Sequence, residues 1–223
     1  MKIIDQTGLI MHQLPDGPLQ TNAYWIDTGT VSCLIDPILD PRNRPEGATR
    51  LNLILATHGH FDHIGRCDDW RSLSSAKLAI HSDEAGYLPD AKLNGSLFFG
   101  AAADYFPAEI LLHDQQVIQL DSRTSLLVIH TPGHTPGGVC LLVLQDQQAR
   151  ALLTGDTLFA GTVGRVDLPG GQAAQLMASL DRLVRISEIY GQDVPVLPGH
   201  GSDTTLREEL RSNPFLTGKA RFK

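Results

Sequence analysis

Three histidines and an aspartate stand within six positions of the stretch THGHFDHIGRC, as His58, His60, Asp62 and His63. In a chain with nine histidines among 223 residues, such a grouping has a chance of only about one in a thousand. Protonated imidazoles at this spacing would repel one another, whereas a cation binds them in the neutral form. The cluster therefore predicts a metal site.

Three further candidate ligands, His134, Asp156 and His200, each follow a glycine and stand just past an apolar, strand-like run. The glycine lets the backbone turn tightly and approach other groups closely. Strand ends at one edge of a sheet form one patch, and loops on a rigid scaffold are where function usually resides. We therefore expect four separate segments to bring seven side chains to one place.

The spacing also predicts how two metal ions share these ligands. Residues two apart in an extended stretch point the same way, whereas the residues that follow enter a helix and point elsewhere. We expect the first ion on His58, His60 and His134, the second on Asp62, His63 and His200, and Asp156 as a bridge. Each ion keeps an open position, as in catalytic sites. A hydroxide between two ions about 3.5–4 Å apart is a nucleophile at neutral pH, so the pattern predicts metal-assisted hydrolysis, with Asp62 and Asp156 as catalytic residues.

The donor types limit the choice of metal. Histidine and carboxylate ligands accept divalent Zn, Fe or Mn, and we expect Zn. Asp36, at the end of the run 33–35, either starts a turn before Pro37 or orients a ligand imidazole from behind. The remaining histidines lack this context, and we interpret them as structural or exposed: His12, His81, His113 and His130.

Composition narrows the class of partner. A net charge of −7 without a lysine or arginine run argues against nucleic acid and anionic membranes, so a small molecule is the expected ligand. The chain shows neither a signal segment nor an apolar run near eighteen residues, which predicts a cytoplasmic protein. Cys33, Cys67 and Cys140 form no C-x-x-C motif, and we interpret them as small buried hydrophobic residues in a reducing compartment.

The pattern of elements predicts one domain over residues 1–223. Short runs rich in Val, Ile and Leu predict strands at 22–29, 31–37, 51–57, 76–82, 116–120, 125–131, 138–144, 149–155 and 193–199. Helical periodicity appears at 61–73, 84–88, 173–190 and 204–212. Two groups of strands with helices between and after them predict two sheets packed face to face, with helices outside.

At this point the residues resemble the metallo-β-lactamase superfamily, whose motif T-H-x-H-x-D-H stands here at 57–63. The later family ligands match His134, Asp156 and His200, and the similarity includes LIDP at 34–37, HTPGHTPGG at 130–138, LLTGDTLFAGTVGRVDLPGG at 152–171 and LPGHG at 197–201. The chain is most similar to the glyoxalase II-like (hydroxyacylglutathione hydrolase-like) branch. The resemblance implies an α+β fold, the αββα sandwich, with two metals in a shallow groove at one edge. It also implies hydrolysis of an acyl-thiol such as S-lactoylglutathione.

Several features depart from that branch. Full-length glyoxalase II enzymes continue into a helical domain that helps to bind glutathione, whereas 23 residues follow His200 here, as in compact bacterial relatives of the branch. Arg66 and Val166 replace the residues usual at two motif positions without touching a ligand position. Arg165 and Asp167 either pair to fix a loop or shape the substrate pocket. The aromatic segment 94–107 belongs either to the core or to a groove wall.

Other functions of the same fold remain as alternatives. A persulfide dioxygenase, which the G-R-x-D segment also resembles, would use one iron on two histidines and an aspartate. A non-catalytic metal-binding protein would be favoured if a ligand were absent, and all seven are present. A secreted β-lactamase is disfavoured because no signal segment is visible. We expect a monomer or small homo-oligomer acting on a small acyl-thiol.

Overall fold

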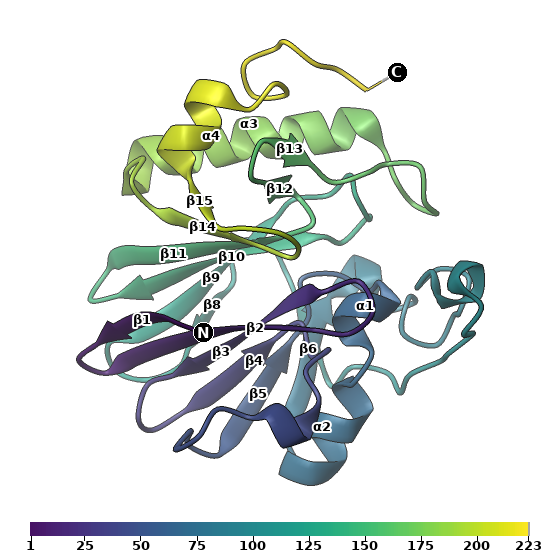
Figure 1. The fold of residues 1–223 in the computed structure, drawn as a ribbon, viewed down its shortest axis with the longest axis vertical. Coiled ribbons are helices and arrows are strands. Elements are labelled where there is room, and N and C mark those ends of the chain that lie inside the picture. The colour runs from purple at the N-terminus through teal and green to yellow at the C-terminus, as the bar shows by residue number, and fades with distance from the viewer. Residues whose placement is uncertain (223) are drawn as a thin grey trace.

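Two β-sheets pack face to face with helices on both outer faces, as the computed structural model in Figure 1 shows. The structure describes residues 1–222. The first sheet has seven strands in chain order: β1 (Lys2–Gln6), β2 (Leu9–Asp16), β3 (Thr21–Asp27), β4 (Ser32–Ile35), β5 (Leu51–Leu55), β6 (Lys77–His81) and β7 (Ile110–Leu112). Strands β1 to β4 pair antiparallel, and β4 to β7 pair parallel.

The second sheet has six strands in the order β15 (Thr204–Thr205), β14 (Pro195–Pro198), β11 (Gln148–Gly155), β10 (Val139–Gln145), β9 (Thr124–His130) and β8 (Val117–Gln119). Its pairs are antiparallel except β11 with β14, which run parallel. A small hairpin, β12 (Leu158–Phe159) with β13 (Thr162–Val163), follows β11. Because β11 and β14 run parallel, the candidate ligands Asp156 and His200, which follow these two strands, lie at the same edge of the sheet.

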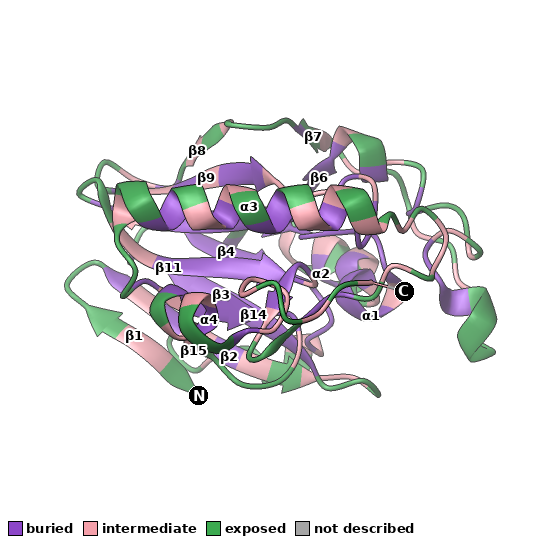
Figure 2. Cartoon of the chain, turned by 90° about the horizontal axis from the view of Figure 1, so that it is seen from above, coloured by how far each residue is buried: buried purple, intermediate pink, exposed green. Residues whose placement is uncertain are grey.

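Within residues 1–222, the sandwich carries four α-helices: α1 (Phe61–Ile64), α2 (Cys67–Ser74), α3 (Ala173–Tyr190) and α4 (Leu206–Ser212). Short 3₁₀ turns lie at Pro41–Asn43, Ser82–Glu84 and Ser96–Phe99. In the view of Figure 2, buried and exposed residues alternate along α3, as expected for a helix with one face on the protein. No helix among residues 1–222 is both long and apolar enough to span a membrane.

Successive side chains of a strand point to opposite faces of its sheet, and as a result the buried side chains form three layers. Tyr24 and Ile26 of β3 face the layer between the sheets, where they join residues of β9 and β10. Trp25, between them in sequence, faces outward instead and packs on Trp70 of α2, with ring centroids 5.5 Å apart. On the other side, the stripe of α3 that includes Leu180 covers the second sheet. These layers confirm the predicted αββα sandwich.

The three cysteines are free and buried, which confirms their interpretation as small hydrophobic residues.

All nine predicted strands are present, and the helix at 173–190 has the predicted bounds. The sequence analysis missed the short strands β7, β12 and β13. It also missed β1 and β2, where the inward positions of β2 include the polar Gln13 and Pro15 interrupts the apolar pattern.

Three helix predictions were wrong in part. The helix predicted at 61–73 is two helices, because Gly65 ends α1 and the amide of Arg66 donates to Pro37 O, 2.9 Å away, outside the helix. The segment 84–88 is not an α-helix: Glu84 is the last residue of a 3₁₀ turn, and its side chain is buried. The last helix starts at Leu206, because residues 204–205 pair with β14 as a short strand.

Candidate dinuclear metal centre

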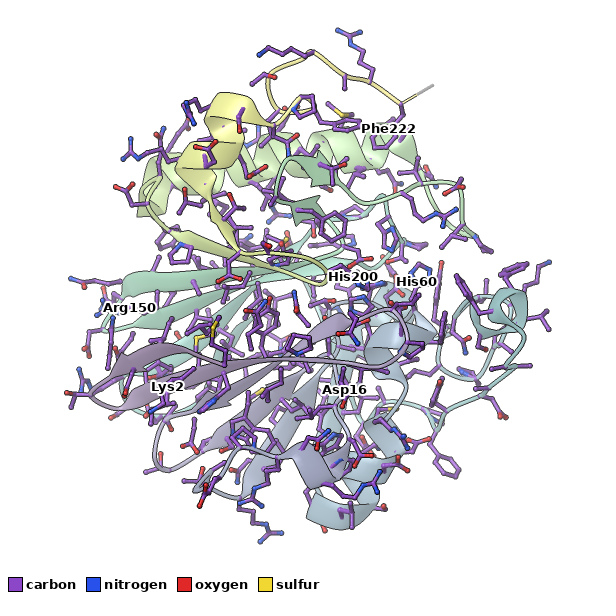
Figure 3. The ribbon with its side chains drawn as sticks, in the orientation of Figure 1. Lys2, Asp16, His60, Arg150, His200 and Phe222 are labelled. Atoms are coloured by element: carbon purple, nitrogen blue, oxygen red, sulfur yellow. The ribbon has the colours of Figure 1, made fainter. Side chains whose placement is uncertain are left out.

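Four segments from both sheets meet at one end of the sandwich. The stretch 57–63 follows β5 of the first sheet, whereas His134, Asp156 and His200 follow β9, β11 and β14 of the second sheet. Figure 3 shows His60 and His200 close together at this end. The seven side chains grouped by the sequence analysis lie together here, in the two predicted sets of three with Asp156 between them.

The first set brings three imidazole nitrogens almost into contact. His60 Nδ1 lies 3.1 Å from His58 Nε2 and 3.0 Å from His134 Nε2. The other nitrogens of two rings are held by acceptors: His58 Nδ1 lies 3.1 Å from Thr57 Oγ1, and His134 Nδ1 donates to Arg165 O at 2.7 Å. These bonds place the protons on Nδ1, so the Nε2 lone pairs of His58 and His134 face the centre.

The second set combines one carboxylate with two imidazoles. His200 Nε2 lies 3.1 Å from Asp62 Oδ2 and 3.3 Å from His63 Nε2. His63 Nδ1 donates to Asp36 Oδ2 at 2.9 Å, and His200 Nδ1 donates to Leu19 O at 3.2 Å. Each Nε2 lone pair is again directed away from the protein acceptor and toward the other members of the set.

Asp156 lies between the two sets. Its Oδ1 is 3.3 Å from His63 Nε2, and its Oδ2 is 3.5 Å from His134 Nε2 and 3.7 Å from His200 Nε2. The buried Oδ1 has no hydrogen-bond partner within the described residues. A carboxylate in contact with both sets has the geometry that a bridging ligand needs.

Asp36 supports the cluster from behind. It is buried, and its backbone takes a positive φ of 52°. Oδ1 accepts the amide of Thr57 at 2.7 Å, while Oδ2 accepts the hydroxyl of Thr57 at 2.9 Å as well as the ring of His63. Because Thr57 Oγ1 also contacts His58 Nδ1, one carboxylate fixes a histidine of each set. Of the two interpretations of Asp36, these contacts favour the orientation of ligand imidazoles.

Glu84 is a supporting residue that the sequence analysis did not single out. It is fully buried, and its two oxygens accept the amides of Gly59 at 2.8 Å and Gly137 at 2.7 Å. Gly59 separates His58 from His60, and Gly137 follows the turn that carries His134. A Cβ at Gly59 would lie 2.8 Å from Glu84 Oε2, and one at Gly137 would lie 2.6 Å from Glu84 Cγ. The two glycines therefore make room for a carboxylate that ties two ligand loops together.

The histidine pKa values shift in opposite directions in the two sets. Burial, together with the neighbouring histidines, lowers the pKa of His58 far below its usual value and that of His60 to about 3. Burial also lowers the pKa of His63, but the carboxylates of Asp156, Asp36 and Asp62 outweigh it and raise that pKa well above its usual value. Burial raises the pKa of Glu84 to about 7 against the effect of its amide donors.

The donor set fits divalent metal ions. Lone pairs of neutral imidazoles about 3 Å apart repel unless a cation lies between them. The carboxylates of Asp62 and Asp156 add negative charge that two cations would balance, and the unpartnered Oδ1 of Asp156 is a free donor. Nitrogen and oxygen donors of this kind suit Zn, Fe or Mn.

A groove of about 430 Å³ opens beside the cluster. Ligand residues from both sets line its floor, and its sides are lined by Leu19, Phe61, Asn94, Gly95, Phe99, Phe159, Thr162, Val163, Arg165 and Leu168. Within the segment 94–107, Phe99 forms part of this wall, whereas Tyr105 packs against the core. A substrate in the groove would lie directly over the cluster.

The remaining candidate residues lie around this groove or away from it. Arg165 and Asp167 form an exposed ion pair at 2.6 Å, and Arg165 also lines the groove, so both interpretations of this pair hold in part. Outside the cluster, the rings of His81 and His130 stack with centroids 4.1 Å apart. His12 lies on β2 and His113 just after β7, so neither contributes to the seven-residue cluster.

The family model for the metallo-beta-lactamase superfamily matches residues 16–206, so the chain belongs to that superfamily. It is 34% identical over 213 residues to the probable metallo-hydrolase YqgX of Bacillus subtilis, covering 92% of this chain and 97% of that protein. It is 30% identical over 173 residues to the hydroxyacylglutathione hydrolase GloC of Haemophilus influenzae, covering 76% of this chain and 78% of that protein.

Solved structures show the same fold. BLEG-1 B3 metallo-beta-lactamase superimposes with a TM-score of 0.81 at 35% identity, covering 93% of this chain and all of that one. TTHA1623 in a di-iron-bound form gives 0.78 at 34% identity, covering 92% and 100%. ETHE1 from Myxococcus xanthus gives 0.74 at 26% identity, covering 95% and 86%. The chain is thus a member of a superfamily of metallo-hydrolases, with a cluster suited to two metal ions.

Proposed function

We propose that the protein is a dinuclear metal-dependent hydrolase that cleaves thioesters such as S-lactoylglutathione. The observation that carries the proposal is the pairing of two three-donor sets around one carboxylate, Asp156, that contacts both. The similarity to GloC, a hydroxyacylglutathione hydrolase, supports the thioester as the substrate class.

Each protein group has a distinct task in this proposal. Two divalent ions in the cluster would activate a water as nucleophile and stabilise the negative charge on the attacked carbonyl. Asp156, which contacts both sets, would be a ligand shared by the two ions and, with Asp62, would balance their charge. Asp36 and Glu84 hold the ligand loops in place. A thiolate is a good leaving group, so no protein acid is needed to protonate it.

Two assays on the purified, metal-loaded protein test the proposal. Elemental analysis should give about two ions per chain, and free thiol should be released from S-lactoylglutathione. A persulfide dioxygenase would instead contain one iron and consume oxygen with glutathione persulfide. The seven available donors favour the hydrolase, because one iron site needs only three of them.

A β-lactamase is the second candidate, favoured by the 35% identity and TM-score of 0.81 with BLEG-1 B3 metallo-beta-lactamase. The same cluster can attack an amide carbonyl, but a β-lactam leaves an amine that needs a proton. Among the described residues, the lining of the groove contains no Glu, Tyr, Cys or Lys, and its Asp and His residues all belong to the ligand cluster. Faster hydrolysis of a chromogenic cephalosporin than of every thioester would favour this candidate instead.

A further inference from the structure

We propose that the groove beside the metal centre takes the apolar acyl chain of a thioester, and that glutathione is not the group it is built to recognise. This inference rests on the proposed thioesterase activity and specifies its substrate class. Three properties of the groove carry it: its apolar walls, the engagement of its polar groups with the protein, and the exposure of aromatic side chains at its rim.

The apolar lining of the groove comes from two groups of side chains, which we call its walls. In the first wall, the rings of Phe61 and Phe99 pack together with centroids 4.9 Å apart. The second wall contains Phe159 and Val163 of the β12–β13 hairpin and Leu168 of the loop that follows. Ligand residues line the same groove, so a chain attached to the reacting carbonyl would contact these walls. Removal of such a chain from water favours binding in proportion to its apolar surface.

The side chains of Asn94 and Arg165, two polar residues that line the groove, are already engaged by other protein groups. Asn94 is buried, and its amide group donates to Ala103 O at 2.9 Å while its oxygen accepts the amide of Ser96 at 2.9 Å. Arg165 is the one lysine or arginine among the described residues that line the groove, and its guanidinium is bound twice by Asp167, at 2.6 and 2.7 Å.

Glutathione carries two carboxylates, and burial of an ionised group without a partner is unfavourable. Within the described residues, the one lysine or arginine that lines the groove is already paired with Asp167, so a carboxylate of glutathione would have to compete with Asp167 for it. A thioester whose chain is uncharged and apolar meets no such penalty and gains contact with both walls.

Large apolar side chains remain exposed at the rim. Phe99 is 52% exposed, Leu19 is 42% exposed, and Leu97 and Phe98 next to Phe99 are exposed as well. Apolar groups that cluster at the mouth of a groove mark binding surfaces more often than isolated exposed residues do. An acyl chain that extends out of the groove would cover this surface.

The test compares acetyl, butanoyl and hexanoyl thioesters of N-acetylcysteamine, a small neutral thiol. We expect kcat/KM to rise by about fourfold per methylene while the chain remains between the walls. With the thiol held constant as glutathione, the hexanoyl ester should be cleaved faster than the lactoyl ester. Equal rates along the series, or preference for the lactoyl ester, would overturn the inference.

Variants locate the effect in the groove. Phe99→Ser should lower kcat/KM for the hexanoyl ester by roughly tenfold and for the acetyl ester by less than about twofold. Phe106→Ser is the matched control, because Phe106 is 71% exposed and does not line the groove. If both variants lose the preference for the longer chain equally, the assignment of the groove is wrong.

A binding measurement separates this inference from the proposed function. S-hexyl and S-methyl thioethers of N-acetylcysteamine contain no bond that the enzyme can hydrolyse, so their affinity can be measured by calorimetry. Cleavage of no thioester together with tighter binding of the hexyl compound would refute the thioesterase proposal but support an apolar groove. Cleavage of S-lactoylglutathione without any dependence on chain length would retain the proposed function and refute the inference.

Discussion

Glu84→Gln tests whether the buried carboxylate between two ligand loops controls metal binding. Each oxygen of Glu84 accepts one backbone amide, from Gly59 and from Gly137. Glutamine has the same shape but keeps one acceptor, so its NH₂ group must face one of these two N–H donors. A buried N–H left without a partner costs about 1–3 kcal/mol. At pH 8, above the pKa of about 7 that burial gives Glu84, the carboxylate is mostly charged, and a bond to a charged acceptor is at the upper end of that range.

The energetic cost of this unpaired N–H should lower the affinity for metal ions. If the loops must return to their native positions before the histidines can bind, a cost of about 2–3 kcal/mol lowers the apparent affinity by roughly 30- to 150-fold. Titration of the metal-free variant with Zn²⁺ against a competing chelator measures this change. Thermal unfolding of the same metal-free protein measures the loss of stability separately.

Glu209→Gln is the matched control. Glu209 is also buried, and its side chain accepts bonds from the Gly161 amide, the Thr204 hydroxyl and the Asn213 amide group, none of which belongs to the metal cluster. Both variants should unfold at a lower temperature, but only Glu84→Gln should lose metal affinity. Equal metal affinity of the two variants would refute the reasoning and leave Glu84 a purely structural role.

Three further predictions concern the cluster and the thiols. Fully loaded protein should contain about two ions per chain, and a single ion with His63 and His200 dispensable would contradict the dinuclear assignment. Asp156→Asn should fold yet lose turnover and metal, since a neutral amide bridges two cations poorly; near-normal turnover with two ions bound would disprove the bridge. Burial raises the pKa of all three cysteine thiols, that of Cys140 to about 11. Iodoacetamide at pH 8 should therefore label none in the native protein and all three after unfolding, as counted by mass spectrometry.

The sequence predicted the parts of the molecule whose signals are local. The ligands stand in short motifs, and apolar runs next to them specify strands by composition alone, so both the grouping of the seven side chains and the layers of the sandwich could be expected. Asp36 was recognised as a candidate for the same reason, because it closes an apolar run.

The parts that were missed depend on distant contacts. Nothing in the segment Ser82–Glu84 distinguishes Glu84 from an exposed acidic residue, and its role appears only where Gly59 and Gly137 approach it across the fold. The break between α1 and α2 likewise depends on Pro37, which accepts the amide of Arg66. The motif T-H-x-H-x-D-H leaves the residue at position 59 free, and a glycine there allows another group to approach the backbone closely. Gly59 is therefore the one signal in the sequence that could have pointed to Glu84.

The joining of two sheets at the metal centre determines when the site can form as the chain is synthesised. His63 and His200 lie 137 residues apart, and their Nε2 atoms are 3.3 Å apart in the folded protein. A ribosome-bound chain that ends before β14 can form the first sheet and contains the whole first set of ligands, but it contains only two of the three ligands of the second set. Contacts of such long range form late in folding. Binding of the second ion should therefore follow emergence of residue 200 from the ribosome, so that a centre with both ions marks a chain whose two sheets have already docked.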